Sequence, residues 1–294
     1  MIHYKDAKIQ LLDLPGILEG ASEGRGRGRQ VIAVAKSADL ILMVLDATKN
    51  DAHKDILTRE LEAVGIRLNK APPQVTITKK KTGGVSFSST VPLTHMDEKL
   101  AAQILAEYKC FNAGVLFRED ATVDEFIDVI EGNRKYIRCL YVYNKIDVLS
   151  IEEVDALARL PFSIPISCVA NLGTDALLAQ MWSVMDLRRV YTKKTGCKPE
   201  FAEPVMLSAA RGGASVETFA GQLHADLARL CRFALVWGTS SKHYPQRCGL
   251  GHILEDEDVV QVVKKKLTAA DPRNTLTASE RHAAKGEKKA PLRS

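Results

Sequence analysis

The sequence predicts an α/β fold: a mostly parallel sheet, interrupted by a small inserted α+β domain and followed by a further module. Two observations predict the sheet. Apolar runs of strand length alternate with stretches of helical spacing, and residues 40–45 are apolar throughout rather than at every second position. Strands that are apolar on both faces need cover on both faces, which is typical of parallel sheets.

Each element of the main sheet has its own signal. Residues 8–14 form an apolar run that ends near Asp13 and is broken by a Pro-Gly pair, so we expect a strand and then a functional loop. The later elements follow from apolar runs and helical spacing: a helix over 29–37, strands over 39–46 and up to Asn144, a helix over 151–160, a short strand over 164–167 and a helix over 175–187.

Residues 65–136 depart from this alternation. They hold two prolines, two alternating strands separated by a Gly-Gly turn and two helix-like stretches, which together indicate a small α+β domain. Because strands of the main sheet lie on either side, the domain is expected to be inserted rather than appended. The main domain would then comprise residues 1–64 and 137–191.

The C-terminal third indicates a separate module. After a polar linker over 192–203, residues 204–266 show a strand, a glycine turn, a helix and a further short strand. Residues 267–294 are poor in apolar side chains and rich in Lys and Arg, so we expect a disordered basic tail.

The composition is that of an ordinary globular protein. With 46% hydrophobic and 26% charged residues among 294, collagen-like, fully disordered and membrane-embedded classes fit poorly. No apolar run approaches the roughly 20 residues that cross a bilayer, and no signal stretch is seen, so we expect a cytoplasmic protein. A net charge of +5 is compatible with nucleic-acid contact but does not demonstrate it. The six cysteines include no CxxC pair, which disfavours a zinc ribbon and favours reduced thiols.

The string DLPG, from Asp13 to Gly16, follows the first predicted strand. A carboxylate at the carboxyl end of such a strand can hold a water molecule of a Mg²⁺ shell, and a glycine amide can approach a phosphate because no side chain blocks it. Asp13 and Gly16 are therefore candidate residues for Mg²⁺, through water, and for a γ-phosphate. An ordinary strand end followed by a turn would give the same letters, so the string alone is weak.

The string NKID, from Asn144 to Asp147, follows another apolar strand. The carboxylate of Asp147 can accept two N–H donors from the edge of guanine, donors that adenine lacks. Asn144 can tie adjacent loops, and the apolar stem of Lys145 can cover the ring. In the string ISC, the backbone at Ser167 and Cys168 could contact the base oxygen. DLPG and NKID in this order are specific, although each alone also fits a polar strand end.

These residues resemble the guanine-nucleotide domain of translation-factor-type GTPases. The longer strings are similar to those of the developmentally regulated GTP-binding proteins, relatives of the Obg GTPases, and the similarity covers residues 2–266. It runs through DLPGILEGASEGRGRGRQVIAVAKSADLILMVLDATK, LEAVGIRLNKAPPQVTITKKKTGGVSFSSTVPLTH and FALVWGTSSKHYPQRCGLGHILEDEDVVQVVKK. The strings ISC, VYTKKTG and WGTSSKHYPQRCGL look more like the second of the two eukaryotic paralogues than the first.

The resemblance implies a P-loop-NTPase-like parallel sheet, an insert similar to domain 2 of ribosomal protein S5 and a β-grasp TGS domain. It implies that GTP is bound by Asn144, Lys145, Asp147, Ser167 and Cys168, with Mg²⁺ and also K⁺ as cofactors. It further implies association with the ribosome or RNA, and with a dedicated regulatory protein. No membrane or DNA partner is expected.

One departure from the family is a string that is absent. The P-loop pattern GxxxxGK[ST], whose amides and lysine hold phosphates and whose hydroxyl binds Mg²⁺, occurs nowhere in the sequence. In the family the P-loop and first strand precede the segment that begins here at Met1. We therefore expect an incomplete sheet whose missing first strand leaves its neighbours without hydrogen-bond partners. No catalytic residue is assigned, because Ile17 stands where many small GTPases place a water-orienting glutamine.

Alternative functions remain open at this point. The chain is a GTP-binding protein that hydrolyses GTP and acts with ribosomes, or it is a nucleotide-impaired module that binds RNA or a protein because the P-loop is absent. A true start upstream of Met1 would leave the first function unchanged. Whether the chain as it stands is an enzyme is not decided by these residues.

Overall fold

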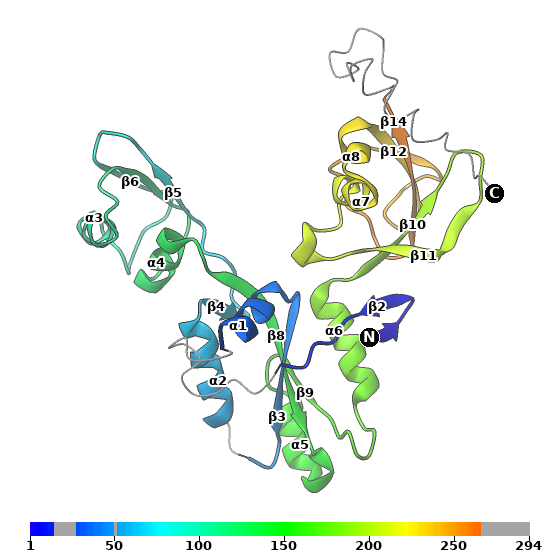
Figure 1. The fold of residues 1–294 in the computed structure, drawn as a ribbon, viewed down its shortest axis with the longest axis horizontal. Coiled ribbons are helices and arrows are strands. Elements are labelled where there is room, and N and C mark those ends of the chain that lie inside the picture. Colours follow the sequence, from blue (N-terminus) through cyan, green and yellow to red (C-terminus); the bar gives the residue numbers. More distant parts are fainter. Residues whose placement is uncertain (15–27, 50–51, 266–294) are drawn as a thin grey trace, which may run out of the picture. The chain divides into compact units, whose positions relative to one another are not determined.

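The computed structural model describes residues 1–14, 28–49 and 52–265. The chain forms two compact units, the first made mainly of Ile9–Met185 and the second mainly of the chain from Asp186 onward. Figure 1 shows the elements of both. The predicted basic tail over 267–294, the string from Pro15 to Gly16 and Ile17 lie outside the described residues.

The main sheet of the first unit is parallel, as predicted. Its central strand β8 pairs with β3, β4 and β9, each in the parallel sense. Helices lie on both sides of the sheet (Figure 1). In chain order its elements are α1 (Gly28–Ser37), β3 (Leu40–Asp46), α2 (Ala52–Ala63), β4 (Ile66–Leu68), β8 (Lys135–Asn144), α5 (Ile151–Ala158), β9 (Ser163–Pro165) and α6 (Thr174–Met185).

The side chains of β8 alternate between two cores. Cys139 packs in a cluster with Leu61 of α2, whereas Leu140 and Val142 pack in a cluster with Met181 of α6. All of these side chains are buried. Both faces of the strand are therefore covered, which is why its sequence is apolar without alternation.

The predicted strand over residues 8–14 is wrong. β2 (Ala7–Ile9) ends at Ile9, and it pairs with β1 (Ile2–Tyr4) in a two-stranded sheet apart from the main one. A strand persists only where its backbone groups find ladder partners. Among the described residues, β3 is paired along one edge only, by β8, and the apolar run beyond Ile9 does not pair along its other edge.

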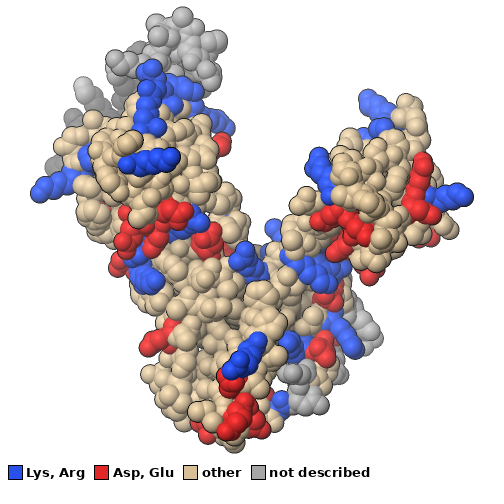
Figure 2. All heavy atoms as spheres, turned by 180° about the vertical axis from the view of Figure 1, so that it is seen from behind, with Lys and Arg blue, Asp and Glu red and all other residues tan. Residues whose placement is uncertain are grey.

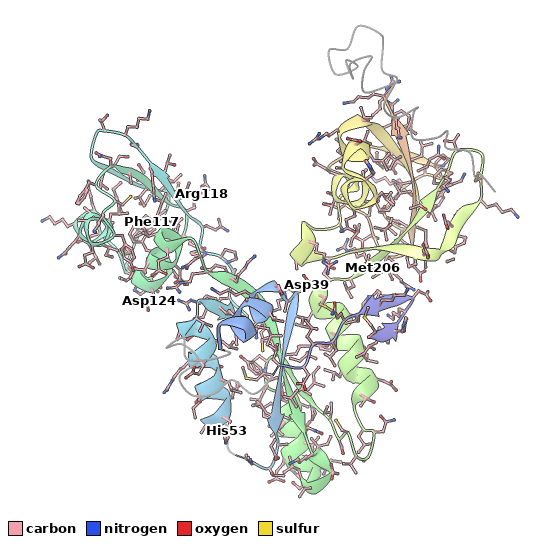
Figure 3. The ribbon with its side chains drawn as sticks, viewed as in Figure 1. Asp39, His53, Phe117, Arg118, Asp124 and Met206 are labelled. Atoms are coloured by element: carbon pink, nitrogen blue, oxygen red, sulfur yellow. The ribbon has the colours of Figure 1, made fainter. Side chains whose placement is uncertain are left out.

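The insert is a three-stranded sheet packed against two helices. Its elements are β5 (Val75–Lys79), β6 (Val85–Ser89), α3 (Glu98–Glu107), β7 (Ala113–Phe117) and α4 (Val123–Glu131). β7 lies between the other two strands, antiparallel to β5 and parallel to β6. Phe117, labelled in Figure 3, is fully buried, and its ring centroid is 5.4 Å from that of Phe126 on α4. The predicted α+β character is confirmed.

The insert is smaller than predicted. Ile66 and Leu68 are buried in the core cluster that contains Leu61 of α2, and Ile66 pairs with Lys135 at the start of β8. The outermost residues of the predicted range 65–136 therefore belong to the main sheet. The three residues of β4 are too few to show a strand pattern in the sequence. Their pairing with β8 is what makes them a strand.

A buried ion triad joins the insert to the main sheet. Arg67 on β4 donates from Nε and Nη2 to the two carboxylate oxygens of Asp128 on α4, each at 2.7 Å. Arg134 donates from Nε to Asp128 Oδ1 at 2.9 Å. Asp128 is only 5% exposed, and the forked contact of its carboxylate with the Arg67 guanidinium fixes both distance and direction. The base of the insert is thus anchored to β4.

The second unit is a five-stranded sheet packed on helix α7. The strand order is β11-β10-β14-β12-β13. Its core contains Val190, Val236 and Phe219, all fully buried. In chain order its elements are β10 (Arg188–Lys193), β11 (Pro199–Leu207), a 3-10 helix (Ala209–Arg211), α7 (Val216–Leu223), α8 (Ala225–Leu230), β12 (Cys231–Trp237), β13 (Gln246–Cys248) and β14 (Asp258–Lys264).

The predicted linker over 192–203 is wrong, because β10 and β11 form an antiparallel pair across it. β10 also pairs with β14 in the parallel sense, so it is an inner strand and the unit begins before residue 204. Because the side chains around Lys194 and Lys198 are polar, nothing in the sequence indicated this pairing.

The six cysteines are free thiols, as predicted, and none of them forms a disulfide.

Candidate functional site

The ends of β3 and β8 form one edge of the candidate site. The parallel pairing places Asp46 opposite Asn144, and the ladder continues with the Ala47 N–H donating to the Asn144 carbonyl at 2.9 Å. Figure 3 labels Asp39 just before β3 and His53 on α2, and β3 runs from the first toward the second. Ligands of open α/β sheets bind outside the carboxyl ends of strands, so this edge is the natural place for a site.

Asn144 ties the loop after β8 to the loop after β9. Its Oδ1 accepts from the backbone N–H of Lys145 at 2.8 Å and from that of Cys168 at 3.1 Å. Ile166 also donates from its N–H to the Tyr143 carbonyl at 2.7 Å, just before this point. The sequence strings NKID and ISC, more than 20 residues apart, are thereby brought together.

Ser167 holds Asp147. The Ser167 hydroxyl is fully buried and donates to Asp147 Oδ1 at 2.5 Å, while the Ala170 N–H donates to the same Ser167 oxygen at 3.2 Å. Asp147 itself is exposed, within the 3-10 helix Ile146–Val148. Only one of its carboxylate oxygens is engaged among the described residues, so an exposed acceptor edge is held in one orientation.

A glycine shapes the turn that follows. Gly173 has φ +72°, and a Cβ placed there would lie 2.5 Å from the Pro165 carbonyl oxygen. The turn is closed by Ser167 and Leu172, which exchange backbone hydrogen bonds at 3.0 and 2.9 Å. The backbone that presents Ser167 and Cys168 therefore approaches its neighbour closely enough to need a residue without a side chain.

Lys145 is held at both ends. Its backbone is left-handed, with φ 71°, and its N–H is bonded to Asn144 as described. Its Nζ lies 2.6 Å from Asp46 Oδ2 across the two strand ends. This hydrogen bond with Lys145, followed by those from Thr48, holds the pKa of the Asp46 carboxyl well below its usual range.

Asp46 was missed by the sequence analysis. It lies at the end of β3 just as Asn144 lies at the end of β8, and that parallel position is the signal that could have found it. Asp46 also borders a cavity of about 200 Å³ on the α2 side of the strand. The cavity is lined by Val44, Leu45, Asp46, Lys49, His53, Lys54, Leu57 and Tyr143.

The residues predicted for metal and phosphate are not brought into this cluster. Asp13 is exposed and makes no hydrogen bond or ion pair with any other described residue, and Gly16 lies outside the described range. Within residues 1–14, 28–49 and 52–265, no group of three or more His, Cys, Asp or Glu side chains could hold a metal ion. A lone exposed carboxylate is compatible with contact to a cation through water, but it does not make a metal site.

Comparison with known families and proteins places the chain. A family model described as a 50S ribosome-binding GTPase matches residues 1–80, a model of the C-terminal region of the MMR_HSR1 domain matches 82–187, and a TGS domain model matches 188–264. Developmentally-regulated G-protein 2 of Arabidopsis thaliana is 64% identical over 100% of this chain and 74% of its own length. The chain belongs to the developmentally regulated GTP-binding protein family.

Other members of the developmentally regulated GTP-binding protein family match at similar levels. Developmentally-regulated G-protein 1 of Arabidopsis thaliana is 62% identical over 100% of this chain and 74% of its own length. Developmentally-regulated GTP-binding protein 2 of Homo sapiens is 58% identical over 90% of this chain and 72% of its own length. Because relatives with both numbers match this closely, assignment to the second paralogue stays a prediction.

The family assignment confirms the predicted fold class. The first unit is a GTPase-type domain with a parallel sheet, and the second is a TGS domain. The TGS model begins at residue 188, the first residue of β10, which agrees with the corrected start of the second unit. Among the described residues, no helix has the length and apolar character needed to span a bilayer.

Proposed function

We propose that the chain binds guanine nucleotide at the ends of β8 and β9, hydrolyses GTP and acts with ribosomes in the cytoplasm. The observation that carries this proposal is the network of Asn144, Cys168, Ser167 and Asp147. It joins two loops through one side-chain amide and orients one exposed carboxylate. The family to which the chain belongs is named for GTP binding, which supports the same ligand.

The chemistry of Asp147 selects guanine. Guanine presents a ring N–H and an amino group side by side, and a carboxylate accepts from both as a planar pair. Ser167 holds one oxygen of Asp147 and so fixes the plane of the carboxylate. The bond from the Cys168 N–H to Asn144 Oδ1 holds the loop at Cys168 beside the end of β8, where the backbone of that loop would contact the base oxygen. Lys145 offers its stem to the face of the ring.

The phosphate side of the proposal depends on residues that bind through water or lie outside the described range. Asp13 would hold Mg²⁺ through a water molecule, and Gly16 would face the γ-phosphate. Asp13 is exposed and makes no hydrogen bond or ion pair with other described residues, which fits such indirect contact. Mg²⁺, and K⁺ by family resemblance, would neutralise charge on the phosphates. We assign no side chain to the hydrolytic step itself.

Ribosome or RNA association forms the second part of the proposal. It is supported by the matching family model, whose description is a 50S ribosome-binding GTPase, and by the TGS domain. Figure 2 shows Lys and Arg side chains gathered at one end of the second unit. Positive charge of this kind attracts nucleic-acid phosphates. A dedicated regulatory protein of the kind that the family resemblance implies is proposed as a further partner.

An alternative function is a module that binds RNA or a protein independently of nucleotide. The pattern GxxxxGK[ST], whose residues usually hold the β- and γ-phosphates, does not occur in these 294 residues, which span 74% of the length of Developmentally-regulated G-protein 2. A protein without those phosphate contacts would be such a nucleotide-impaired module. This alternative predicts co-sedimentation with purified ribosomes that does not change when GTP is added.

The test is base specificity in the full chain. Binding of a fluorescent GDP derivative is measured by titration, with unlabelled GDP, ADP and xanthosine diphosphate as competitors. Asp147→Asn replaces one acceptor by a donor, so it should weaken GDP by at least about tenfold, the cost of losing charged hydrogen bonds. The same variant should gain affinity for xanthosine diphosphate, whose base has an oxygen where guanine has its amino group.

A matched control and a clear failure accompany this test. Asp155→Asn makes the same change in an exposed pair with Arg159 on α5, where both side chains are more than half exposed, and should leave GDP binding unchanged. Saturable binding that does not discriminate GDP from ADP would overturn guanine selection by Asp147, and no binding by the wild-type chain would overturn nucleotide binding here. Ribosome co-sedimentation that ignores GTP would then support the alternative.

A further inference from the structure

We infer that Asp46 is a positioning residue for guanine binding: it anchors the ammonium of Lys145 so that the lysine stem is held ready to cover the base. This inference rests on the proposed nucleotide site and deepens it. Asp46 would not touch the nucleotide. It would act through Lys145 alone, across the ends of β3 and β8.

The placement of Asp46 follows from the pairing of the strands. Asp46 is the last residue of β3 and lies opposite Asn144, the residue that precedes Lys145. Residues paired at the ends of parallel strands lie at one edge of the sheet. A carboxylate at this position therefore faces the first side chain of the loop after β8. The contact is made over 99 positions of sequence, between Lys145 Nζ and Asp46 Oδ2 at 2.6 Å.

Hydrogen bonds from Thr48 orient the Asp46 carboxylate independently of Lys145. Its Oδ1 accepts from the Thr48 hydroxyl at 2.7 Å and from the Thr48 N–H at 3.1 Å, which leaves Oδ2 for the ammonium. The side chain of Asp46 is only 20% exposed, although Lys145 is 57% exposed. Hydrogen bonds to both oxygens also keep the pKa of Asp46 low, so the carboxylate is charged at neutral pH.

Anchoring both ends restricts Lys145. Its N–H is bonded to Asn144, its backbone has the left-handed conformation and its ammonium is bonded to Asp46. A free lysine side chain loses rotamer entropy when it is ordered. Because Asp46 has already ordered this one, a base that packs on the stem does not bear that loss at the time of binding.

Other cations near Asp46 do not take the place of Lys145. Lys49, His53 and Lys54 line the same cavity, but among the described residues none of them forms an ion pair with Asp46. Lys54 instead lies over the ring of Tyr141, with Nζ 4.4 Å from its centroid. Among the described residues, the Asp46 carboxylate thus forms its ion pair with Lys145, the residue after Asn144.

The first test measures the lysine without nucleotide. Full-length wild type and Asp46→Asn are treated briefly with an amine-reactive reagent, and modification of each lysine is followed by mass spectrometry. Loss of the ion pair should raise labelling of Lys145 about threefold to fivefold, the size expected for a partly exposed pair. Labelling of Lys70, which pairs with Glu62 elsewhere in the unit, should not change. Equal labelling of Lys145 in both proteins would overturn the inference.

The second test measures nucleotide binding in the same proteins. Asp46→Asn should weaken fluorescent GDP about threefold to fivefold with base preference unchanged, since Asp147 is intact. Asp46→Glu keeps a carboxylate within reach of the ammonium and should recover part of both the affinity and the protection from labelling. The thermal midpoint of Asp46→Asn should equal that of wild type. If Asp46 had only a structural role, the loss of affinity in Asp46→Asn would come with a lower thermal midpoint.

The outcomes separate the inference from the proposed function. A wild-type chain that fails to bind GDP overturns the proposed function, and with it any role of Asp46 in binding. Wild-type binding, together with Asp46→Asn affinity equal to wild type, overturns the inference alone. Asp155→Asn, which removes an exposed ion pair with Arg159 that involves neither Asp46 nor Lys145, is the matched control and should match wild type in both tests.

Discussion

The two sides of the candidate site are held very differently. On the base side, Asn144 and Ser167 each bond two other groups, and these bonds link the loops after β8 and β9. On the phosphate side, Asp13 belongs to a segment that pairs with no strand of the main sheet, and it contacts no described residue through a polar bond. The loops on the base side follow strands that are paired in the main sheet, whereas the segment around Asp13 does not follow such a strand. The pairing of the preceding strand therefore accounts for the difference in how firmly the two sides are positioned.

The largest effect should come from breaking the backbone of the base side. Gly173→Ala places a methyl group against the Pro165 carbonyl at a positive φ, so we expect a loss of about 2–4 kcal/mol in the free energy of unfolding. Urea denaturation of the full chain, followed by circular dichroism, measures this. Gly84→Ala is the control: its φ is +70° but nothing lies within 4 Å, so about 1–2 kcal/mol is expected. Equal losses would mean that the close approach at Gly173 is unimportant.

A smaller effect is expected when one buried hydrogen bond of the base side is removed. Ser167→Ala deletes the hydroxyl that holds Asp147 and should cost about 1–2 kcal/mol in unfolding free energy. It should also weaken GDP, since Asp147 loses its fixed plane. Ser163→Ala is the matched control, because the buried Ser163 hydroxyl has no hydrogen-bond partner among the described residues and its removal should change stability by less than about 0.5 kcal/mol. If both variants behave alike, Ser167 does not orient Asp147.

The smallest effect is expected on the phosphate side. Asp13→Asn removes a charge that makes no bond to the described residues, so the free energy of unfolding should change by less than about 0.5 kcal/mol. Preference for GDP over xanthosine diphosphate should also stay the same, because that preference depends on Asp147. Competition binding and urea denaturation check both. A clear loss of stability in Asp13→Asn would show that the two sides are more alike than their bonds suggest.

The sequence predicted the end of β8 because that strand is defined locally. The apolar run before NKID indicates a strand, and β8 ends at Asn144 as expected. The string ISC pointed to Ser167 and Cys168, more than 20 residues further along, and the resemblance to a known family implied the same two residues. Asp46 was missed because its role depends on the pairing of β3 with β8, and pairing is not written in either strand alone.

The errors of the sequence analysis also come from pairing. Residues 8–14 look like a strand but have no partner beyond Ile9, whereas residues 66–68 look like part of the insert but pair with β8. The stretch 192–203 looks like a linker because its side chains are polar, yet most of it lies in the β10 and β11 hairpin. In each case the prediction rested on local composition alone. The strand that pairs with the segment, or the lack of one, could not be known from that composition.

The triad of Arg67, Asp128 and Arg134 links the insert firmly to the main sheet. Breaking a buried ion pair by removing one partner costs about 3–5 kcal/mol, so the insert cannot swing freely about β4. β4 is paired with the first residues of β8, and the last residue of β8 is Asn144. The ion triad therefore lies beside the start of one continuous ten-residue strand whose other end is the base side of the site.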